Sequence, residues 1–246
     1  MEITNKTALV TGAGSGIGYQ IAKLLIEKGN KVIIVGRNKV KIERAAQELG
    51  ATAFVCDVSK PAEIEILANR VQQDYPELSV LVNNAGVANL YKLGEGADAF
   101  TKAKDEFDVN YFAPVLLTER LLPTLKNQGD AAIVNITSNV TFHPLVVLPS
   151  YSDSKAALHS HTVSLRHTLA KDTNVKVFEV MPSLVNTDAT KDMGGENGMH
   201  PDVVATATVN GIQEDRYEIY VGETSAQRDA YFANPDKAIV SFNAGL

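Results

Sequence analysis

The chain has 246 residues, of which 45% are hydrophobic and 21% charged, and its 23 basic and 29 acidic residues give a net charge of −6. This composition predicts a single domain that spans residues 1–246 and has a sizeable core. An acidic chain without a run of basic residues is a poor binder of nucleic acid or of anionic membranes. No apolar run approaches the ~20 residues of a membrane helix, the N-terminus lacks a signal-peptide pattern, and the single cysteine, Cys56, excludes an internal disulfide. A cytoplasmic protein is therefore expected.

The sequence predicts short apolar strands that alternate with amphipathic helices along the chain. Strands are predicted, in chain order, at residues 6–11, 31–35, 51–56, 79–82, 131–136, 175–180 and 217–221. Helices are predicted at residues 17–28, 39–49, 61–74, 98–126 with an interruption at Pro114, 151–171 and 202–212. Strands that are apolar on both faces are typical of a parallel sheet covered by helices. The sequence thus predicts an α/β fold, a single doubly wound Rossmann-type domain with a mostly parallel seven-stranded sheet and helices on both faces.

Polar, glycine or proline residues follow the predicted strands at the points where those strands end. They are Thr11, Gly36, Asp57, Asn83, Ser138 and Pro182. A doubly wound sheet binds its ligands at the carboxyl ends of its strands. These residues are therefore expected to lie along one rim and to form one site.

A glycine-rich loop, Thr11-Gly-Ala-Gly-Ser-Gly-Ile-Gly18, joins the first strand to the first helix. Its spacing fits T-G-x-x-x-G-x-G, whereas strict G-x-G-x-x-G fails because Ile17 occupies the last position. Glycine lets the backbone approach a ligand closely, and a helix N-terminus offers N–H groups to a pyrophosphate. A turn used only for close packing is the alternative, but the strand before the loop and the helix after it favour a nucleotide site.

The end of the second strand indicates which dinucleotide is bound. An NAD site favours a carboxylate there for the ribose hydroxyls, whereas this chain has Gly36-Arg37-Asn38 and no acid between Glu27 and Glu43. Arg37 can pair with a 2′-phosphate. NADP(H) is therefore expected in preference to NAD(H), with an ordinary surface arginine at position 37 as the alternative.

A candidate catalytic group lies between residues 138 and 155. Ser138 follows the fifth strand, and Tyr151 and Lys155 lie four residues apart on one face of the next helix. A nearby ammonium group favours the phenolate, and a decrease of ~2–3 units in the pKa of Tyr151 would make it a usable proton donor and acceptor near neutrality. For the pair alone, a half-buried tyrosine beside a solvated lysine is the more common interpretation.

Five motifs in order resemble the short-chain dehydrogenase/reductase family, in its branch of roughly 250 residues. They are Thr11-Gly-x-x-x-Gly-x-Gly18, Asp57-Val58, Asn83-Asn-Ala-Gly86, Ser138 and Tyr151-x-x-x-Lys155. Each motif alone is weak, whereas the ordered set at these spacings is specific. The resemblance extends from about Lys6 to Val221.

The resemblance implies a role for each matching residue. It places Gly12, Ser15, Gly16, Ile17 and Gly18 at the pyrophosphate, Arg37 at the adenosine ribose or its phosphate, Asp57 and Val58 at the adenine, Asn83, Ala85 and Gly86 on the nicotinamide-ribose side, and Pro182, Val185, Thr187, Tyr151 and Lys155 around the nicotinamide and its ribose. Ser138, Tyr151 and Lys155 match the catalytic triad. Asn110 matches the fourth catalytic residue, which holds a water behind the lysine.

The activity that the resemblance implies is hydride transfer between NADP(H) and a carbonyl compound or secondary alcohol. Ser138 would orient the oxygen, Tyr151 would give or take its proton, and Lys155 would lower the tyrosine pKa and hold the ribose. Asn110 and water would pass the proton onward. One alternative is a non-catalytic protein that senses a dinucleotide and binds a partner on the same fold. Another is an epimerase that uses bound nicotinamide transiently, although its branch has a different glycine spacing.

Two segments are expected to enclose the substrate. Loop 139–149 is mostly apolar, which favours a small or apolar ketone or aldehyde, although these side chains could equally pack against a partner subunit. Residues 184–201 contain three glycines and are typical of a substrate lid. Ser183 replaces the family's usual glycine after Pro182, which predicts a slightly different turn. A similar variant occurs in a bacterial branch sometimes named for D-alanyl-lipoteichoic acid operons.

The histidines do not form a metal-binding pattern. His143 is expected to be solvated in its loop, whereas His159, His161 and His167 are expected to line a subunit interface. None of these three pairs with another at i, i+4 and no cysteine joins them, so no metal site is expected. The resemblance implies a homodimer or homotetramer formed through the two long helices, with residues 229–246 at another interface.

Overall fold

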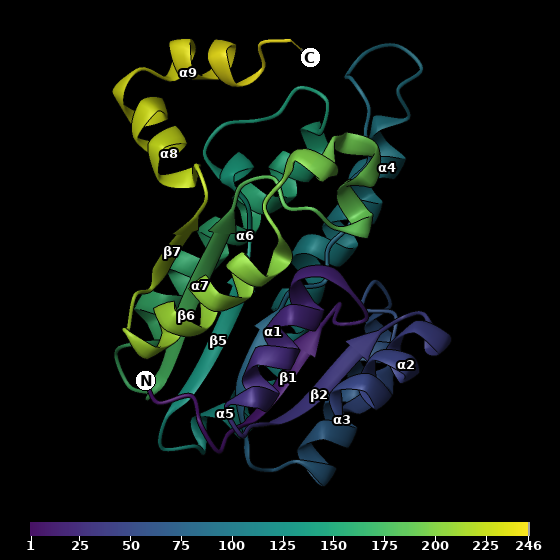
Figure 1. Cartoon of the computed structure of the whole chain (residues 1–246), viewed down its shortest axis with the longest axis vertical. Helices are drawn as coiled ribbons and strands as arrows, with labels where there is room; N and C mark the ends of the chain where they lie inside the picture. Colours follow the sequence, from purple (N-terminus) through teal and green to yellow (C-terminus); the bar gives the residue numbers. More distant parts are fainter. Residues whose placement is uncertain (246) are drawn as a thin grey trace.

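The computed structural model describes residues 1–245 and contains a seven-stranded sheet in the order β3-β2-β1-β4-β5-β6-β7 (Figure 1). The strands are β1 Thr7–Thr11, β2 Lys31–Gly36, β3 Thr52–Val55, β4 Leu78–Asn83, β5 Ala131–Ile136, β6 Val175–Pro182 and β7 Glu218–Val221. All six neighbouring pairs are parallel. The predicted doubly wound fold is confirmed, and its strand order reverses between β1 and β4, where such folds bind ligands.

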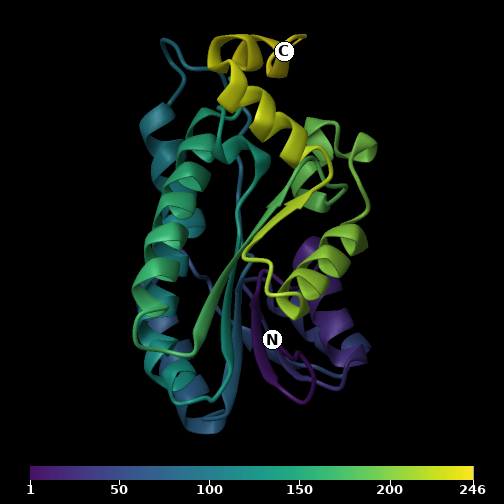
Figure 2. The same cartoon turned by 90° about the vertical axis from the view of Figure 1, so that its left-hand side faces the viewer.

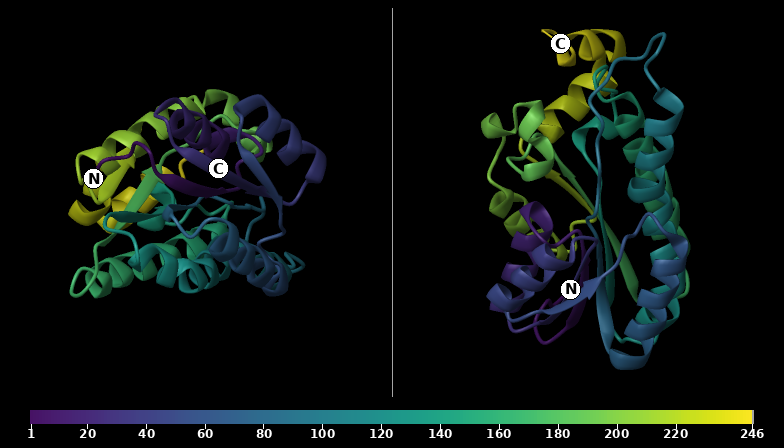
Figure 3. Two further views of the ribbon diagram at one scale, coloured as in Figure 1. Left: turned by 90° about the horizontal axis from the view of Figure 1, so that it is seen from below. Right: turned by 90° about the vertical axis from the view of Figure 1, so that its right-hand side faces the viewer.

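Helices cover both faces of the sheet (Figures 2 and 3). One face packs against α1 Gly16–Glu27, α2 Lys39–Leu49 and α7 Pro201–Gln213, and the other against α3 Pro61–Asp74, α4 Ala99–Phe107, α5 Ala113–Lys126 and α6 Pro149–Leu169. Every residue of β4 and β5 is buried. Burial on both faces explains why the strands are continuously apolar instead of alternating.

The long helix predicted at residues 98–126 is interrupted earlier than expected. A π-helical turn, Asp108–Phe112, separates α4 from α5, and the Ala113 N–H donates to the Asp108 carbonyl, five residues back. Pro114 has no N–H, and its ring clashes with the carbonyl four residues back, which is that of Asn110. The helix therefore widens by one residue before the proline, and the distortion falls at Asn110.

Two helices that the sequence did not predict complete the chain. Helix α8, Thr224–Ala233, and helix α9, Pro235–Phe242, lie beyond the carboxyl edge of the sheet, at the end away from the N-terminus (Figure 1). Asn243 fixes this pair to the loop before α6, because it accepts from the Val146 N–H at 2.8 Å and donates to the Pro144 carbonyl at 3.1 Å. Phe232 and Val240 of this pair are exposed, so the interface expected at residues 229–246 stays a prediction. Within residues 1–245 no helix has both the length and the apolarity to cross a membrane.

Candidate active site

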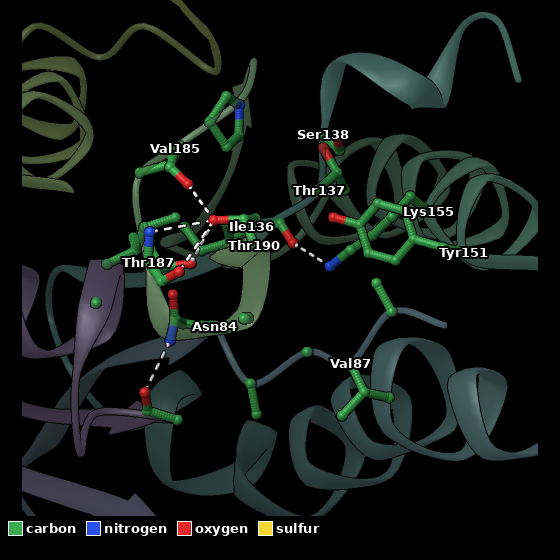
Figure 4. A pocket seen from close by; sticks show the side chains of 18 of the residues that line it. Asn84, Val87, Ile136, Thr137, Ser138, Tyr151, Lys155, Val185, Thr187 and Thr190 are labelled. Carbon is green, nitrogen blue, oxygen red and sulfur yellow. Dashed lines mark hydrogen bonds between the residues drawn. The ribbon is translucent and has the colours of Figure 1, made fainter. Parts of the chain in front are cut away.

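A cavity of about 1040 Å³ lies at the carboxyl edge of the sheet and contains most of the predicted site. The predicted residues that line it are Gly12, Ser15, Gly16, Ile17, Arg37, Asp57, Val58, Ala85, Gly86, Ser138, Tyr151, Lys155, Pro182, Val185 and Thr187. Figure 4 shows its central part, where Ser138, Tyr151 and Lys155 face Thr187 across the cavity. Of the six residues expected along one rim, Gly36, Asp57, Ser138 and Pro182 line this cavity, whereas Thr11 and Asn83 do not.

The glycine-rich loop provides a close and unobstructed approach to the backbone. Gly12 has a φ of +66°, and a Cβ there would lie 2.8 Å from Ala85 Cα. Helix α1 starts at Gly16, and the side chain of its N-cap residue, Ser15, makes no capping hydrogen bond. The first N–H groups of the helix thus face the cavity without a side-chain partner, which fits the pyrophosphate of a dinucleotide.

Two predicted cofactor residues lie behind the cavity wall. Gly18 does not line the cavity, and a Cβ there would lie 2.4 Å from the Asn84 Nδ2 atom. Asn83 is buried in the sheet, where its amide donates to Asn135 at 2.8 Å and to Thr118 at 3.3 Å. Both residues support the site by packing. The adjacent Asn84 lines the cavity and donates to the Thr11 carbonyl, and the Asn-Asn motif did not indicate which of the two faces the ligand.

The adenosine end carries both charges that the sequence singled out. Arg37 is exposed at the end of β2 and lines the cavity, as do Asp57 and Val58 after β3. Burial opposes ionisation of Asp57, but hydrogen bonds from the hydroxyl and N–H of Ser59 hold its pKa below the usual value. Lys41 also lines this end and forms a 2.7 Å ion pair with Asp188. No sequence pattern indicates this contact, because the partners are 147 positions apart.

The catalytic end combines the end of β5 with the first turns of α6. The Lys155 Nζ atom is buried, donates to the Ile136 carbonyl at 2.9 Å and lies 5.7 Å from the centre of the Tyr151 ring (Figure 4). Pro149 starts the helix two residues before Tyr151, so the tyrosine lies in the first turn, beside Ser138. The three side chains predicted to act together therefore share one wall of the cavity.

The electrostatics of this wall correct one expectation. Burial raises the pKa of Tyr151 to about 12, although the Ser138 hydroxyl lowers it. Burial also lowers the pKa of Lys155 to about 8, although the Glu179 carboxylate raises it. In the protein alone, burial and the Glu106 carboxylate thus outweigh the hydrogen bond from Ser138. Tyr151 is protonated at neutral pH, which is the form that a proton donor requires.

Asn110 does not line the cavity but supports its wall from the π-helical turn. Its Oδ1 accepts from the Val87 N–H at 2.9 Å, and its Nδ2 donates to the Val87 carbonyl at 2.9 Å and to Ser154 Oγ at 3.0 Å. A Cβ on Gly86 would meet both Asn110 Oδ1 at 3.4 Å and Lys155 Nζ at 3.7 Å. Asn110 therefore lies just behind Lys155, where the family resemblance placed it.

A family model described as short chain dehydrogenase matches residues 6–198. The chain belongs to the short-chain dehydrogenase family. The uncharacterised oxidoreductase DltE of Bacillus subtilis strain 168 is 37% identical to it over 249 residues, which cover 99% of this chain and 98% of DltE. Curated relatives of this dehydrogenase are thus named as oxidoreductases.

Solved structures agree with this membership. A short-chain dehydrogenase/reductase from Burkholderia phymatum in complex with NAD is 25% identical, with a TM-score of 0.84 over 95% of this chain and 92% of that one. A short-chain dehydrogenase from Burkholderia cenocepacia J2315 in complex with NADP has a TM-score of 0.87 with full coverage of both chains, and its 24% identity supports the fold alone.

The remaining wall of this short-chain dehydrogenase comes from the segment after β6. Two 3₁₀ helices, Asp188–Met193 and Gly195–Asn197, form the segment predicted as a lid. Thr190 donates to the Val185 carbonyl at 2.6 Å (Figure 4). Ser183, which replaces the usual glycine, accepts from the Glu223 N–H at 3.4 Å. The serine therefore ties the turn after β6 to the start of α8.

One prediction for histidine is wrong. His143 is 1% exposed instead of solvated, because the Phe242 ring of α9 lies 3.9 Å from it, and burial lowers its pKa. His159 lies 2.9 Å from a carboxylate oxygen of the fully buried Glu179 and remains partly exposed, so its place at a subunit interface stays a prediction. Phe242 and Gln227 line the cavity, and they come from helices that the sequence did not predict.

Proposed function

We propose that this chain is an NADP(H)-dependent oxidoreductase that transfers a hydride between the cofactor and a carbonyl compound or secondary alcohol. One observation carries the proposal. Ser138, Tyr151 and Lys155 share one wall of a cavity whose other end is formed by the N-terminus of α1 and the glycine-rich loop. A dinucleotide in this cavity would reach from the helix terminus to the tyrosine hydroxyl, and its nicotinamide supplies the hydride.

Each protein group has a role that follows from its position. Ser138 binds the reacting oxygen, and Tyr151, protonated at neutral pH, donates the proton during reduction and accepts it during oxidation. Lys155 provides positive charge and donors for the nicotinamide ribose. Asn110 supports the wall behind the lysine and holds water for onward proton transfer. Gly18 and Asn83 maintain the packing of the loop and sheet that carry these groups.

The choice of NADP(H) rests on the end of β2. Arg37 is exposed there beside the cavity, and Lys41 lies on the first turn of α2, whereas no acidic residue occupies positions 28–42. A 2′-phosphate between these two cations would gain charge-assisted hydrogen bonds, and a small Gly36 leaves space for it. Structurally similar proteins bind either NAD or NADP, so the fold does not distinguish the two cofactors. The positive charges after β2 are therefore the observation that favours NADP(H), which carries the 2′-phosphate.

The lining of the catalytic end favours a small or apolar ketone or aldehyde. Leu145, Leu148 and Phe242 line the cavity together with Val140 and Met193. Apolar walls contribute binding by burying apolar surface. A phosphorylated substrate would need cations besides Lys155, which is already assigned to the nicotinamide ribose, and the other residues that line this end of the cavity carry no positive charge. We propose further that residues 184–201 act as the substrate lid of a single catalytic domain.

The first test is consumption of NADPH, compared with NADH, by the purified protein with a panel of ketones, aldehydes, diketones and quinones. Consumption with NADPH in preference to NADH is expected. Tyr151→Phe should retain NADPH binding and lose nearly all turnover, because the ring remains but the proton donor is removed. Turnover at the parent rate would refute the catalytic assignment. NADPH binding without turnover of any compound would favour a dinucleotide-sensing protein.

A further inference from the structure

Three side-chain hydrogen bonds connect helix α8 to the Ser138 hydroxyl. Ser138 Oγ donates to Asn139 Oδ1 at 3.0 Å, and Asn139 Nδ2 donates to Gln227 Oε1 at 2.8 Å. Gln227 Nε2 then donates to Glu223 Oε2 at 3.3 Å. Ser138 and Asn139 are buried, whereas Glu223 is exposed at the start of α8. The three hydrogen bonds thus connect the solvent-exposed Glu223 carboxylate to the Ser138 hydroxyl, which is proposed to bind the reacting oxygen of the substrate.

The direction of all three bonds follows from the carboxylate. An ionised Glu223 only accepts hydrogen bonds, so Gln227 must turn its NH₂ group toward it and its carbonyl oxygen toward Asn139. Asn139 must then present its own NH₂ group to Gln227. Its oxygen is left facing Ser138, which has to donate. A charge two side chains away therefore determines where the single Ser138 proton points.

We propose that Asn139 and Gln227, oriented by Glu223, are positioning residues that hold the Ser138 hydroxyl ready for the substrate oxygen. This inference rests on the proposed function, in which Ser138 binds that oxygen. The hydroxyl carries one proton, which Asn139 Oδ1 accepts, so the lone pairs of the Ser138 oxygen are left to accept from the Tyr151 hydroxyl or from the hydroxyl of an alcohol substrate. A group that is oriented before the substrate arrives needs less reorganisation in the transition state.

The same helices that orient Ser138 also close the substrate end of the cavity. Gln227 lines that cavity together with Phe242, and the Asn243 amide fixes α9 to the loop before α6. Helices α8 and α9 lie beyond residues 6–198, which the family model matches. Correct docking of this C-terminal pair is therefore coupled to the orientation of the serine.

The experiment compares variants that break, reverse or rebuild the bonds. Gln227→Leu keeps a side chain of similar bulk and removes its polar groups, so kcat should decrease about tenfold. Binding of NADPH should not change, because Gln227 lies at the opposite end of the cavity from Arg37. In Gln227→Lys, the new ammonium group can only donate, so the Asn139 amide must rotate and present its oxygen to the lysine and its NH₂ group to Ser138. This reversal should lower kcat to a similar extent. Ser225→Ala, at an exposed position of the same helix, is the matched control and should keep the parent kcat.

A double variant separates orientation from packing. Glu223→Gln combined with Gln227→Glu lets the new amide donate to the new carboxylate, which still accepts from Asn139. It should recover kcat to within about threefold of the parent, since the orientation of Asn139 is restored. Unchanged kcat in Gln227→Leu, or a double variant no better than Gln227→Leu, would overturn the inference.

Neutron diffraction of the deuterated protein provides a readout that does not depend on turnover. The deuteron on Ser138 Oγ should point to Asn139 Oδ1, and a deuteron pointing elsewhere would overturn the inference in a protein with or without activity. A parent enzyme that reduces no carbonyl compound would refute the proposed function instead. The two failures are therefore distinguishable.

Discussion

The charge of Lys155 depends on the balance between burial and one carboxylate. Burial lowers the pKa of its ammonium group to about 8, and the Glu179 carboxylate only partly opposes this. Its Nζ donates to the Ile136 carbonyl, which cannot supply the charge compensation of an ion pair. The lysine is thus mostly charged at neutral pH and loses its charge in mild alkali, well before Tyr151 ionises.

Carbonyl reduction should therefore decline in mild alkali. We expect kcat/KM for reduction to be constant below about pH 8 and to fall above it, because kcat/KM reports the ionisation of the free enzyme. Lys155→Arg, whose guanidinium keeps its charge, should be slower but should not show this decline below about pH 10. A profile for the parent enzyme that stays flat from about pH 7 to pH 10 would contradict the assignment.

At the scale of single residues, the sequence predicted positions better than contacts. Ser138, Tyr151 and Lys155 were predicted because motif spacing places them on one strand end and one helix face. The pKa of Tyr151 was predicted in the wrong direction, because burial depends on packing that spacing does not reveal. His143 was misjudged for the same reason, since the ring that buries it belongs to α9, about a hundred residues away in the sequence.

Helix α6 is joined to the sheet by a charged pair that the proposed chemistry does not use. The His159 ring lies 2.9 Å from an oxygen of Glu179 in β6, and Thr137 at the end of β5 donates to the same carboxylate at 2.7 Å. The hydrogen bond to Glu179 raises the pKa of His159, in spite of burial. Nearby Glu218 also raises it, whereas Arg166 lowers it.

This pair predicts a specific dependence of stability on pH. A histidine whose pKa is raised by folding contributes stability that is fully present below its unfolded pKa of ~6.5 and is lost as the pH rises through the folded value. Denaturant unfolding of the parent should therefore show stability decreasing above about pH 6.5, and His159→Gln should show a smaller decrease. His200→Gln, at an exposed N-cap position, is the control. An equal decrease in His159→Gln and the parent would exclude the pair as the cause.

At the scale of elements, the hydrophobic pattern predicted every strand and the helices that cover the sheet. It placed the break in the long helix at Pro114, whereas the structure distributes the distortion over the preceding turn, Asp108–Phe112. Helices α8 and α9 were not predicted, because both are short and few of their side chains are buried. Their role depends on contacts with loop 142–147, and such contacts have no local signature.

In the whole molecule, the two ends of the cavity belong to different parts of the sheet. Strands β1 to β3 carry the glycine-rich loop and Arg37, whereas β5 to β7 carry Ser138 and the segment after β6. The Lys41–Asp188 ion pair connects these parts across the cavity. Both side chains are partly exposed, so the pair contributes little stability by itself. A bound dinucleotide would contact both parts and stabilise the folded chain as a unit.

Thermal unfolding can therefore identify the cofactor without knowledge of the substrate. A ligand that binds only the folded state stabilises it by ~2.7 kcal/mol at a concentration of about 100 times its Kd. NADPH should raise the Tm more than NADH at equal concentration, because only NADPH carries the phosphate that Arg37 can pair. Arg37→Gln should reduce the NADPH shift toward the NADH value, because only Lys41 then remains to pair with the phosphate, and it should leave the NADH shift unchanged. Arg216→Gln, an exposed arginine outside the cavity lining, should change neither shift. A larger shift with NADH in the parent, or a full NADPH shift in Arg37→Gln, would show that Arg37 is an ordinary surface residue and that the charge pattern after β2 does not select the cofactor.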